Sequence, residues 1–573
     1  MATNDVFVTT QVSGANCFTA PELLAETAYV RGVNLSSRSG VLHTRPVFTR
    51  VADLPAGKFQ GAYALFEVTY VIVGGKIYKA DAQGEWVAID GVAFSPYVDM
   101  VYATIVYDYL FLNDGVHMPA IVGPYGNRHL AKQGDDPEIP CGSLCCFGQG
   151  RIFFFDPTQK TLMAGDIYLP GQPESCLKFT EQAFLNESLA ITQPAAYGKA
   201  MSMQFVRNSE TGTGLGQLIV FYENGYCAYN VYYPRSEWLD QQLGQSLGRY
   251  AGAGGQNFVA QQNNDLFFRT GNGLTTLRDY ASQTNEGLRA LPITIPIGPL
   301  LARDQTWTLE QGSIVSQDSR ALFTHGLRRF EGGQSFYDSL VSFDMASFYA
   351  EGNTQMTFDG VWTGPRVTKV FSGKYKGNDV TFITSKTSEN GNVLWKLSDQ
   401  IYDGAKVSPR SRWYSRYIDF GSPFQYAKFL FLDLWLSGMR ADVEVRLFFR
   451  SDSELWQEAS NGAFTVPYYT SGASELGAGE QVLPQGRAKV RIAIDEEVFD
   501  PVSLRALRFG TAFQFCLEVT GVAASPKMWF KAEVDDGDKW ENRLCESEGS
   551  GTLLTTAGNA GIVLYDYDTE FLE

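Results

Sequence analysis

Three cysteines near residue 140 have the side-chain chemistry of a metal site. Cys141, Cys145 and Cys146 lie close together in the sequence, and His129 is the nearest imidazole. Thiolate and imidazole groups are the usual protein ligands of zinc, often with cysteines paired in a Cys-x-x-Cys motif. The cluster lacks that motif, and two adjacent cysteines do not easily point at one ion. We therefore expect packed free thiols and no bound metal here.

Paired carboxylates are a second possibility, because glycosidases work with two carboxyl groups roughly 5 to 10 Å apart. The candidates are Asp114, Asp156, Asp265 and Asp359, which all lie at or beside predicted turns. Aspartate is common in turns because its side chain accepts hydrogen bonds from nearby backbone amides. The chain also has no repeated Ser-x-Asp-x-Gly-x-Thr-Trp box of the sialidase type. We therefore interpret these aspartates as turn residues.

Other catalytic signatures are missing from the sequence. It has no Walker phosphate loop, no Gly-x-Ser-x-Gly elbow and no His-Glu-x-x-His helix, and it contains only four histidines. The glycine-rich ranges 212–216 and 252–255 lack the strand-to-helix setting of a dinucleotide site, so we interpret them as loops. We predict that the protein is not an enzyme, with no catalytic residues and no cofactor.

The elements that position these residues are predicted to be β-hairpins. Runs of alternating apolar and polar residues are joined by turns that contain glycine or asparagine, which is the pattern of half-buried antiparallel strands. Such hairpins begin at Val71, Tyr109, Gly150, Gln217, Asp265 and Val380. The first five begin roughly 40 to 70 residues apart, near the ~40–50-residue repeat of propeller blades. The pattern predicts a ring of small antiparallel sheets.

Length and composition predict an all-β protein with more than one domain. The 573 residues exceed the size at which a single core stops growing, which is ~250–300 residues. Hydrophobic residues make up 44% and charged residues 19%, which excludes general disorder. An aromatic content of 14% together with 57 glycines fits a chain of many strands and turns.

The predicted architecture is a β-propeller with inserted loops or short helices, followed by a β-sandwich or jelly-roll-like domain. Two inserted segments, 178–189 and 238–250, have helix-like sequences, and a short helix is expected after Pro21. The predicted parts are an N-terminal docking segment 1–50, a β-propeller 51–410, a β-sandwich-like domain 411–534 and an acidic C-terminal arm 535–573.

The net charge of −17 argues against a protein that grips nucleic acid by neutralising its phosphates. It is compatible with a conduit through which DNA slides without sticking. No run approaches the ~18–20 apolar residues of a membrane span, and the N-terminus lacks the features of a signal peptide. We expect a protein made in a cytosol, with no membrane span.

The segment Val33–Phe48, VNLSSRSGVLHTRPVF, and several later hairpins such as FLNDGVHMPAIV and LIVFYENGYCAY resemble the tail nozzle proteins of short-tailed bacteriophages, also called tail tubular protein B. In that family the segment reads Asn-Leu, a turn, then Arg-Pro-Gly, and Val47 stands here in place of the glycine. The matching residues are Asn34, Leu35, Gly40, Arg45 and Pro46. The likeness covers about residues 30 to 285.

The resemblance implies a structural virion protein of the phage tail, built on a β-propeller and made in the host cytoplasm. Six copies would form a ring below the portal and its adaptor, the head–tail connector. Its lumen would retain DNA and conduct it at ejection, and its outside would meet a tail fibre or needle protein. Carboxylates facing the bore would reduce drag on DNA. The channel-lining candidates are Asp535, Asp536, Asp538, Glu210 and Asp318.

Two other functions remain open from the sequence. A propeller can serve as a receptor-binding protein that recognises or cleaves host-surface glycans, and aromatic side chains would supply the stacking platforms. Core packing is nevertheless the expected role of the aromatic residues near the second domain. These are Trp413, Tyr414, Tyr417, Tyr426, Trp435 and Trp456. A cellular propeller scaffold is the third possibility, and it predicts neither ring formation nor glycan binding.

Overall fold

The structure is a computed structural model, and it describes most of the chain up to Asp535. The described residues are 6–9, 12–40, 42–80, 86–131, 137–180, 191–192, 195–206, 216–231, 238, 244–249, 252–262, 265–277, 292–302, 304, 309–317, 319–329, 335–345, 357–386, 391–398, 410–419, 427–437, 442–451, 456–459, 464–466, 487–493, 509–521 and 527–535.

The chain forms two compact units, and each is discontinuous in sequence. The sandwich unit comprises residues 1–49, 339–365 and 397–573, and the propeller unit comprises residues 50–338 and 366–396. Three strands run from one unit into the other. These are β6 (Val47–Leu54), β28 (Ser335–Asp344) and β29 (Thr357–Tyr375).

The propeller unit begins with four sheets of four antiparallel strands each, and each sheet is formed by consecutive segments of the chain. The first sheet contains β7 (Phe59–Leu65), β8 (Val68–Val73), β9 (Lys76–Ala80) and β10 (Trp86–Ala93). The second contains β11 (Tyr102–Val106), β12 (Tyr109–Asn113), β13 (Ala120–Val122) and β14 (Arg128–His129). The third contains β15 (Ser143–Gly148), β16 (Arg151–Phe155), β17 (Thr161–Ala164) and β18 (Ile191–Thr192). The fourth contains β19 (Ala200–Val206), β20 (Gln217–Tyr222), β21 (Gly225–Tyr229) and β22 (Gly244–Arg249).

Three further blades complete the propeller, giving seven among the described residues; the fifth is a sheet of its own, and the sixth and seventh are parts of one 14-stranded sheet. The fifth contains β23 (Val259–Gln262), β24 (Asp265–Thr270) and β25 (Gly273–Thr276). The sixth contains β26 (Ile314–Gln317), β27 (Arg320–Arg329) and the start of β28. The seventh contains the second half of β29 with β30 (Asn378–Lys386) and β31 (Asn392–Ser398), and its outermost strand is β6. The last blade is therefore completed by a strand that precedes the first blade in sequence.

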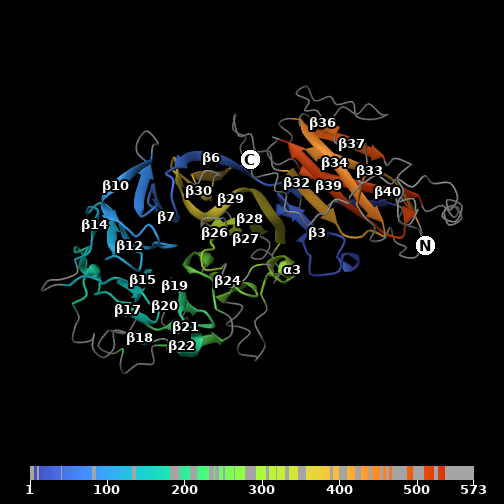
Figure 1. Cartoon of the computed structure of the whole chain (residues 1–573). Helices are drawn as coiled ribbons and strands as arrows, with labels where there is room; N and C mark the ends of the chain where they lie inside the picture. The colour runs from blue at the N-terminus through green and yellow to red at the C-terminus, as the bar shows by residue number, and fades with distance from the viewer. Residues whose placement is uncertain are drawn as a thin grey trace. The chain divides into compact units, whose positions relative to one another are not determined.

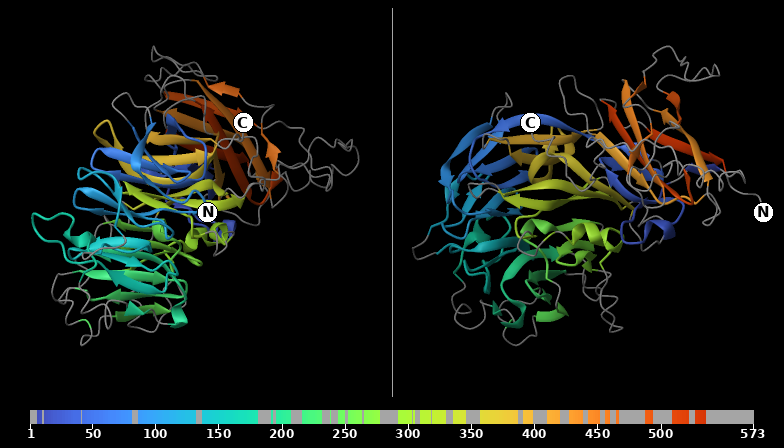
Figure 2. Two further views of the ribbon diagram at one scale, coloured as in Figure 1. Left: turned by 60° about the vertical axis from the view of Figure 1, so that its left-hand side comes forward. Right: turned by 45° about the vertical axis from the view of Figure 1, so that its right-hand side comes forward.

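Apolar clusters between neighbouring sheets hold the ring together. Separate clusters join the first sheet to the second, the second to the third, the third to the fourth and the fourth to the fifth. Another cluster joins the seventh sheet back to the first, with Leu54, Phe371 and Leu394 packed against Val71. The sheets accordingly follow one another around a ring (Figures 1 and 2). The prediction of a β-propeller is confirmed by this order and closure.

A buried ionic cluster lies where the fifth and sixth sheets meet. Asp304 accepts a hydrogen bond from Arg269 of β24 at 3.3 Å and pairs with Nδ1 of His325 of β27 at 2.9 Å. The backbone N–H of Gly326 donates to its other oxygen at 3.0 Å. The three charged or ionisable side chains are at most 3% exposed. The cluster ties the segment before β26 to two neighbouring blades.

The sandwich unit has two sheets that face one another across an apolar core. The first sheet has the order β37-β33-β40-β5-β4, with β1 paired to β40 and β38 to β33. The second includes the run β3-β32-β39-β34-β35, with β2 paired to β3 and β36 to β34. Phe429 of β33 contacts Phe515 of β39, with ring centroids 4.7 Å apart, inside one continuous core cluster. The predicted β-sandwich is confirmed.

The strands of the sandwich unit come from both ends of the chain. They are β1 (Val6–Thr9), β2 (Gly14–Ala15), β3 (Ala28–Val33), β4 (Leu35–Ser36), β5 (Leu42–Thr44), β32 (Arg410–Ser415), β33 (Ala427–Ser437), β34 (Val443–Ser451), β35 (Gln457–Glu458), β36 (Phe464–Val466), β37 (Arg487–Ala493), β38 (Phe509–Gly510), β39 (Phe513–Gly521) and β40 (Lys527–Asp535). Residues 1–49 and 339–365 therefore belong to this unit, where the sequence predicted a separate docking segment and a part of the propeller.

Helices are short in the described residues. They are η1 (Pro21–Leu23), η2 (Arg38–Gly40), η3 (Ser175–Leu177), η4 (Ala195–Tyr197), η6 (Gln256–Phe258), η7 (Ile295–Ile297) and α3 (Gly298–Leu301). The helix expected after Pro21 is a single 3₁₀ turn. The helix expected over 238–250 is wrong for its second half, because residues 244–249 pair with β21 as the outer strand of a blade. The helix expected over 178–189 lies outside the described residues, except for residues 178–180, which are not helical.

Candidate functional site

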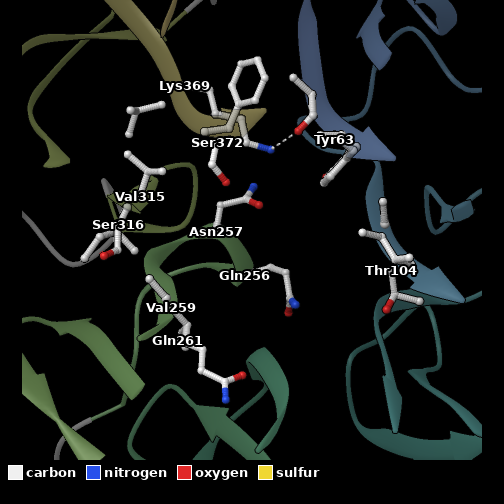
Figure 3. Close-up of a pocket in the computed structure, with 18 of the residues that line it drawn as sticks. Tyr63, Thr104, Gln256, Asn257, Val259, Gln261, Val315, Ser316, Lys369 and Ser372 are labelled. Atoms are coloured by element: carbon white, nitrogen blue, oxygen red, sulfur yellow. Dashed lines mark hydrogen bonds between the residues drawn. The ribbon is translucent and has the colours of Figure 1, made fainter. Parts of the chain in front are cut away.

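The propeller unit has a central cavity of about 530 Å³ that is open to solvent (Figure 3). Its walls are the innermost strands β7, β11, β19, β26 and β29, together with η6 and β23. The side chains at the wall are mainly small, apolar or uncharged polar groups. The polar ones are Thr104, Gln204, Gln256, Asn257, Gln261, Ser316 and Ser372. Among the described lining residues, Lys369 is the only basic side chain, and none is acidic.

Lys369 is buried in this wall without a carboxylate partner among the described residues. Its side chain is on β29, and the residue is 5% exposed. Nζ donates a long hydrogen bond of 3.4 Å to the carbonyl oxygen of Ala62 and lies 4.3 Å from the ring centroid of Tyr63. Burial disfavours the charged ammonium, and this desolvation lowers the pKa of Lys369 to about 7.

A smaller pocket of about 60 Å³ adjoins Lys369 and is also lined by basic side chains. Lys386 of β30 is 6% exposed, and its Nζ donates to the carbonyl oxygen of Gly57. Desolvation lowers the pKa of Lys386 to about 8. Lys58 forms an ion pair with Asp99, at 2.5 Å between Nζ and Oδ1. The carboxylate in this lining, Asp99, is therefore already paired, and lysines outnumber carboxylates here in a chain whose net charge is −17.

The cavity was not predicted from the sequence. Of the predicted channel-lining residues only Asp535 is among the described residues, and it does not line the cavity. Asp535 is the last residue of β40 in the sandwich unit, opposite Lys428 in the sheet. Asp536, Asp538, Glu210 and Asp318 lie outside the described residues. The available signal for Lys369 was a lysine inside the strand-like run Val367–Phe371, where a charge interrupts a row of β-forming residues.

The turn interpretation of the aspartates is confirmed at two positions and wrong at a third. Asp114 accepts hydrogen bonds from the backbone N–H groups of Val116 and His117, and Asp156 caps the turn between β16 and β17. Asp359 instead lies inside β29 of the sandwich unit and is fully buried. It sits within a continuous strand because hydroxyl and amide donors satisfy its carboxylate, namely Ser37 N, Ser37 Oγ and Ser342 Oγ.

The cysteine cluster is divided between two cores. Cys145 and Cys146 are neighbours on β15, so their side chains point to opposite faces of the sheet and join different apolar clusters. Burial raises the pKa of both thiols. Among the described residues no group of three or more potential metal ligands occurs. No helix in the described part of the chain is both long and apolar enough to span a membrane.

Aromatic residues of the sandwich unit mostly form its interior. Trp413, Tyr414 and Tyr417 are 3–5% exposed, and Trp435 and Trp456 are half-buried. Tyr426 lies outside the described residues. The expectation that these side chains serve core packing is confirmed for the three buried ones, which leaves them no open ring face for stacking on a sugar.

The residues that carry the nozzle-protein resemblance form a buried hub in the sandwich unit. Asn34, with φ at +55°, donates from Nδ2 to Thr363 Oγ1 and to the Arg410 carbonyl oxygen, both at 2.9 Å. Its Oδ1 accepts from Arg45 Nε at 2.8 Å and from the backbone N–H of Thr363 at 2.7 Å. One amide side chain thereby joins strands β29 and β32 to the segment between β5 and β6.

Arg45 is the second member of the hub and is 1% exposed. Its guanidinium donates to the carbonyl oxygens of Pro46 at 2.7 Å and Thr363 at 2.9 Å, and it stacks 4.1 Å from the ring centroid of Phe48. Desolvation lowers the pKa of Arg45 to about 9. The hub thus uses an arginine and an asparagine of the family-like segment to hold non-consecutive strands together.

Replacing Asp156 by alanine is expected to destabilise the propeller unit by about 1–2 kcal/mol, because three backbone N–H groups lose their acceptor. These donors belong to Thr158, Lys160 and Thr161. Urea denaturation would measure the loss. Asp156→Asn keeps an acceptor oxygen at the turn and is the matched control, with an expected loss below about 1 kcal/mol. Equal stability of the alanine variant and the wild type would contradict the capping role.

Comparison with known proteins gives distant structural neighbours. The sequence matches no protein-family model and no curated protein. Among solved structures, the AfRom2 CNH domain matches at 9% identity and a TM-score of 0.37, covering 61% of this chain and 99% of that one. YCF48 bound to a D1 peptide matches at 8% and 0.36, covering 63% and 100%. The Cps50 (Swd1) β-propeller domain from Myceliophteria thermophila matches at 8% and 0.36, covering 61% and 100%. The assignment of the propeller rests on the sheet order of the chain itself, because these TM-scores are low.

Proposed function

We propose that this protein is a structural component of a short bacteriophage tail, in which six copies form a nozzle ring below the portal and its adaptor. A β-propeller alone is compatible with many functions, so the fold does not choose among them. The observation that carries the proposal is the buried hub of Asn34 and Arg45. The residues through which the sequence resembles nozzle proteins determine the local fold, so the resemblance reflects more than surface composition.

Exposed apolar side chains at one set of propeller turns support a ring contact. Phe66 follows β7 and is 66% exposed, and Tyr107 follows β11 and is 52% exposed. Both lie in tight turns that leave innermost strands, and both have positive φ, which holds these turns in a defined geometry. Exposed groups of apolar side chains are usual at protein contacts, so a neighbouring subunit in the ring is the proposed cover.

The charge of the chain supports the proposed passage of DNA. Clustered lysine and arginine side chains at the surface would pair with phosphates and slow a moving duplex, whereas a net charge of −17 repels it. In the proposed assembly DNA passes through the lumen of the six-subunit ring without sequence-specific binding. A tail fibre or needle protein contacts the outside of the ring in the virion.

Mass photometry and negative-stain imaging of the purified protein test the proposal, with and without a portal–adaptor complex. The expected result is a particle of six times the 63.4 kDa chain mass, with six-fold symmetry and an open centre, that binds the adaptor. Monomers that ignore the adaptor would contradict it. Trimers that retain host glycans would favour receptor recognition instead.

A paired substitution tests the proposed contact surface. We expect Phe66→Ser together with Tyr107→Ser to shift the ring toward monomers, with at least a tenfold rise in the concentration needed for half-assembly, because two apolar contacts are lost. Tyr97→Ser is the matched control, since Tyr97 is 87% exposed and lies in the connection before β11 instead of the turn after it. Concentration-dependent mass photometry gives the readout, and unchanged assembly of the double variant would rule out this surface.

A further inference from the structure

We propose that the central cavity of the propeller unit binds a small oxyanion, carried by a phosphate or carboxylate group, at the ammonium of Lys369. This site belongs to a single propeller and goes beyond the proposed role of the chain in a tail ring. The proposal rests on the unsatisfied donors of the cavity wall, on the size of the cavity and on the charges around it.

Lys369 has more hydrogen-bond capacity than the protein uses. An ammonium group carries three donors, yet its acceptor is one carbonyl oxygen, that of Ala62, at the long distance of 3.4 Å. The face of Tyr63 supplies a weak cation–π contact. A buried cation without a counter-charge is unfavourable, so an anion at this position would gain a charge-assisted hydrogen bond.

A second donor faces the same space. Asn257 lines both the central cavity and the smaller pocket, and its Nδ2 has only the sulfur of Met100 at 3.2 Å as a partner. Figure 3 shows the amide of Asn257 and the ammonium of Lys369 directed into one space. An amide and an ammonium group together suit an oxyanion.

The cavity has the dimensions of a small-molecule site. Its volume of about 530 Å³ falls within the ~300–1,000 Å³ that is common for ligand pockets. A single oxyanion group fills a small part of it, so a phosphate or carboxylate attached to a larger organic molecule also fits by volume.

The ionisable groups around Lys369 favour an anion over a cation. Lys386 and Lys58 line the adjoining pocket with Lys369, and Asp99 is paired with Lys58. Tyr63 on β7 stays neutral, because burial raises its pKa. No ionisable side chain comes from the described lining residues of β11, β19, β23 or β26. A cationic ligand would meet the buried ammonium of Lys369, whereas an anion neutralises it; Lys386 lines the adjoining pocket and not the central cavity.

Binding to this site is expected to depend on pH. An anion favours the charged form of Lys369, whose pKa is about 7 in the empty cavity, and Lys386, with a pKa of about 8, responds in the same direction. Affinity is therefore high below pH 7 and falls as the pH rises through 7 to 8. Sulfate is the suitable probe for this dependence because its own charge is constant over the range.

Isothermal titration of the full-length protein with sulfate, inorganic phosphate and succinate tests the proposal. We expect the Kd for sulfate to rise at least tenfold between pH 6 and pH 8.5. Lys369→Met should weaken binding at pH 6 at least tenfold, whereas Lys369→Arg should retain it within about threefold, since a guanidinium keeps the charge. Lys160→Met, at an exposed turn outside the cavity, is the control and should bind as the wild type.

Each result distinguishes the proposal from its alternatives. Tighter binding of phosphate than of succinate assigns the site to phosphate compounds, and the reverse order assigns it to carboxylates. If Lys369→Met fails to fold, anion binding at Lys369 is still tested by Lys369→Arg and by the pH dependence of the wild type. Equal binding by Lys369→Met and the wild type, a Kd independent of pH, or no binding of the three probes to the wild type would overturn the proposal.

Discussion

Asp304→Ala is expected to lower the free energy of unfolding of the propeller unit by about 3–5 kcal/mol, because it leaves a buried guanidinium without its counter-ion. Arg269 is completely buried, and its pairing with the Asp304 carboxylate is the ionic contact that compensates its charge. The substitution also removes the acceptor for His325 and for the N–H of Gly326. Urea denaturation followed by tryptophan fluorescence gives the measurement.

Asp304→Asn is the matched control for this cluster. The amide keeps the shape of the carboxylate and one acceptor oxygen but removes the negative charge, so an intermediate loss of stability is expected. If Asp304→Ala lowers the free energy of unfolding by less than about 1 kcal/mol, the cluster contributes little to the stability of the propeller unit.

The same cluster predicts how stability responds to acid. Burial acts to raise the pKa of Asp304, but the hydrogen bond and charge of His325, the charge of Arg269 and the Gly326 N–H outweigh it and hold the pKa below its usual value. A carboxyl with a depressed folded pKa contributes stability above its unfolded pKa of ~3.9 and loses it as the pH falls through the folded value. The stability difference between wild type and Asp304→Ala should therefore be full at pH 6 and shrink as the pH falls below ~4.

Asn34→Ala is expected to destabilise the sandwich unit by a similar amount, about 3–5 kcal/mol. Alanine removes four hydrogen bonds and leaves Arg45 Nε and the N–H of Thr363 without their acceptor, at about 1–3 kcal/mol for each unsatisfied buried donor. Alanine also tolerates a φ of +55° less well than asparagine does, so a further backbone cost is expected, at most roughly 1–2 kcal/mol.

Two control variants separate these contributions in the same urea denaturation experiment. Asn34→Gly removes the backbone cost but not the lost hydrogen bonds, so it should be more stable than Asn34→Ala and less stable than the wild type. Asn34→Asp keeps the acceptor for Arg45 and supplies it with a counter-charge, so the smallest loss is expected. If the Asn34→Ala variant is as stable as the wild type, the hub does not contribute to the stability of the sandwich unit.

Local pattern was sufficient to predict several hairpins of the propeller from sequence. Alternation and turn residues depend on near neighbours, so hairpins such as that beginning at Val71 were identified correctly. The segment 244–249 was assigned to a helix because its residues are weak strand formers, and only pairing with β21 makes it a strand. The partner of β6 was not predictable from local pattern, because β31 lies more than 300 residues away in sequence.

The candidate site was beyond sequence analysis for a related reason. The pKa of Lys369 is lowered because its side chain is buried beside Ala62 and Tyr63. These two residues belong to the first sheet of the propeller, whereas Lys369 belongs to the last. Asp359 was misassigned to a turn because its buried hydroxyl partners, Ser37 and Ser342, are likewise distant in sequence. Asn34 and Arg45 were noted in the sequence as positions that match nozzle proteins, but their hydrogen bonds to each other and to Thr363 were not predicted.

The closure of the last blade by β6 affects the order in which the chain can mature during synthesis. The first blade leaves the ribosome early, but the seventh sheet, whose Phe371 and Leu394 pack against Val71 of that blade, is made hundreds of residues later. Until then, the apolar face of β8 at Val71 has no partner from the seventh sheet. Both units alternate along the chain, so no single cut yields either one intact. Translation must pass Lys396 before the propeller unit can reach its final topology, and it must pass β40 before the sandwich unit can.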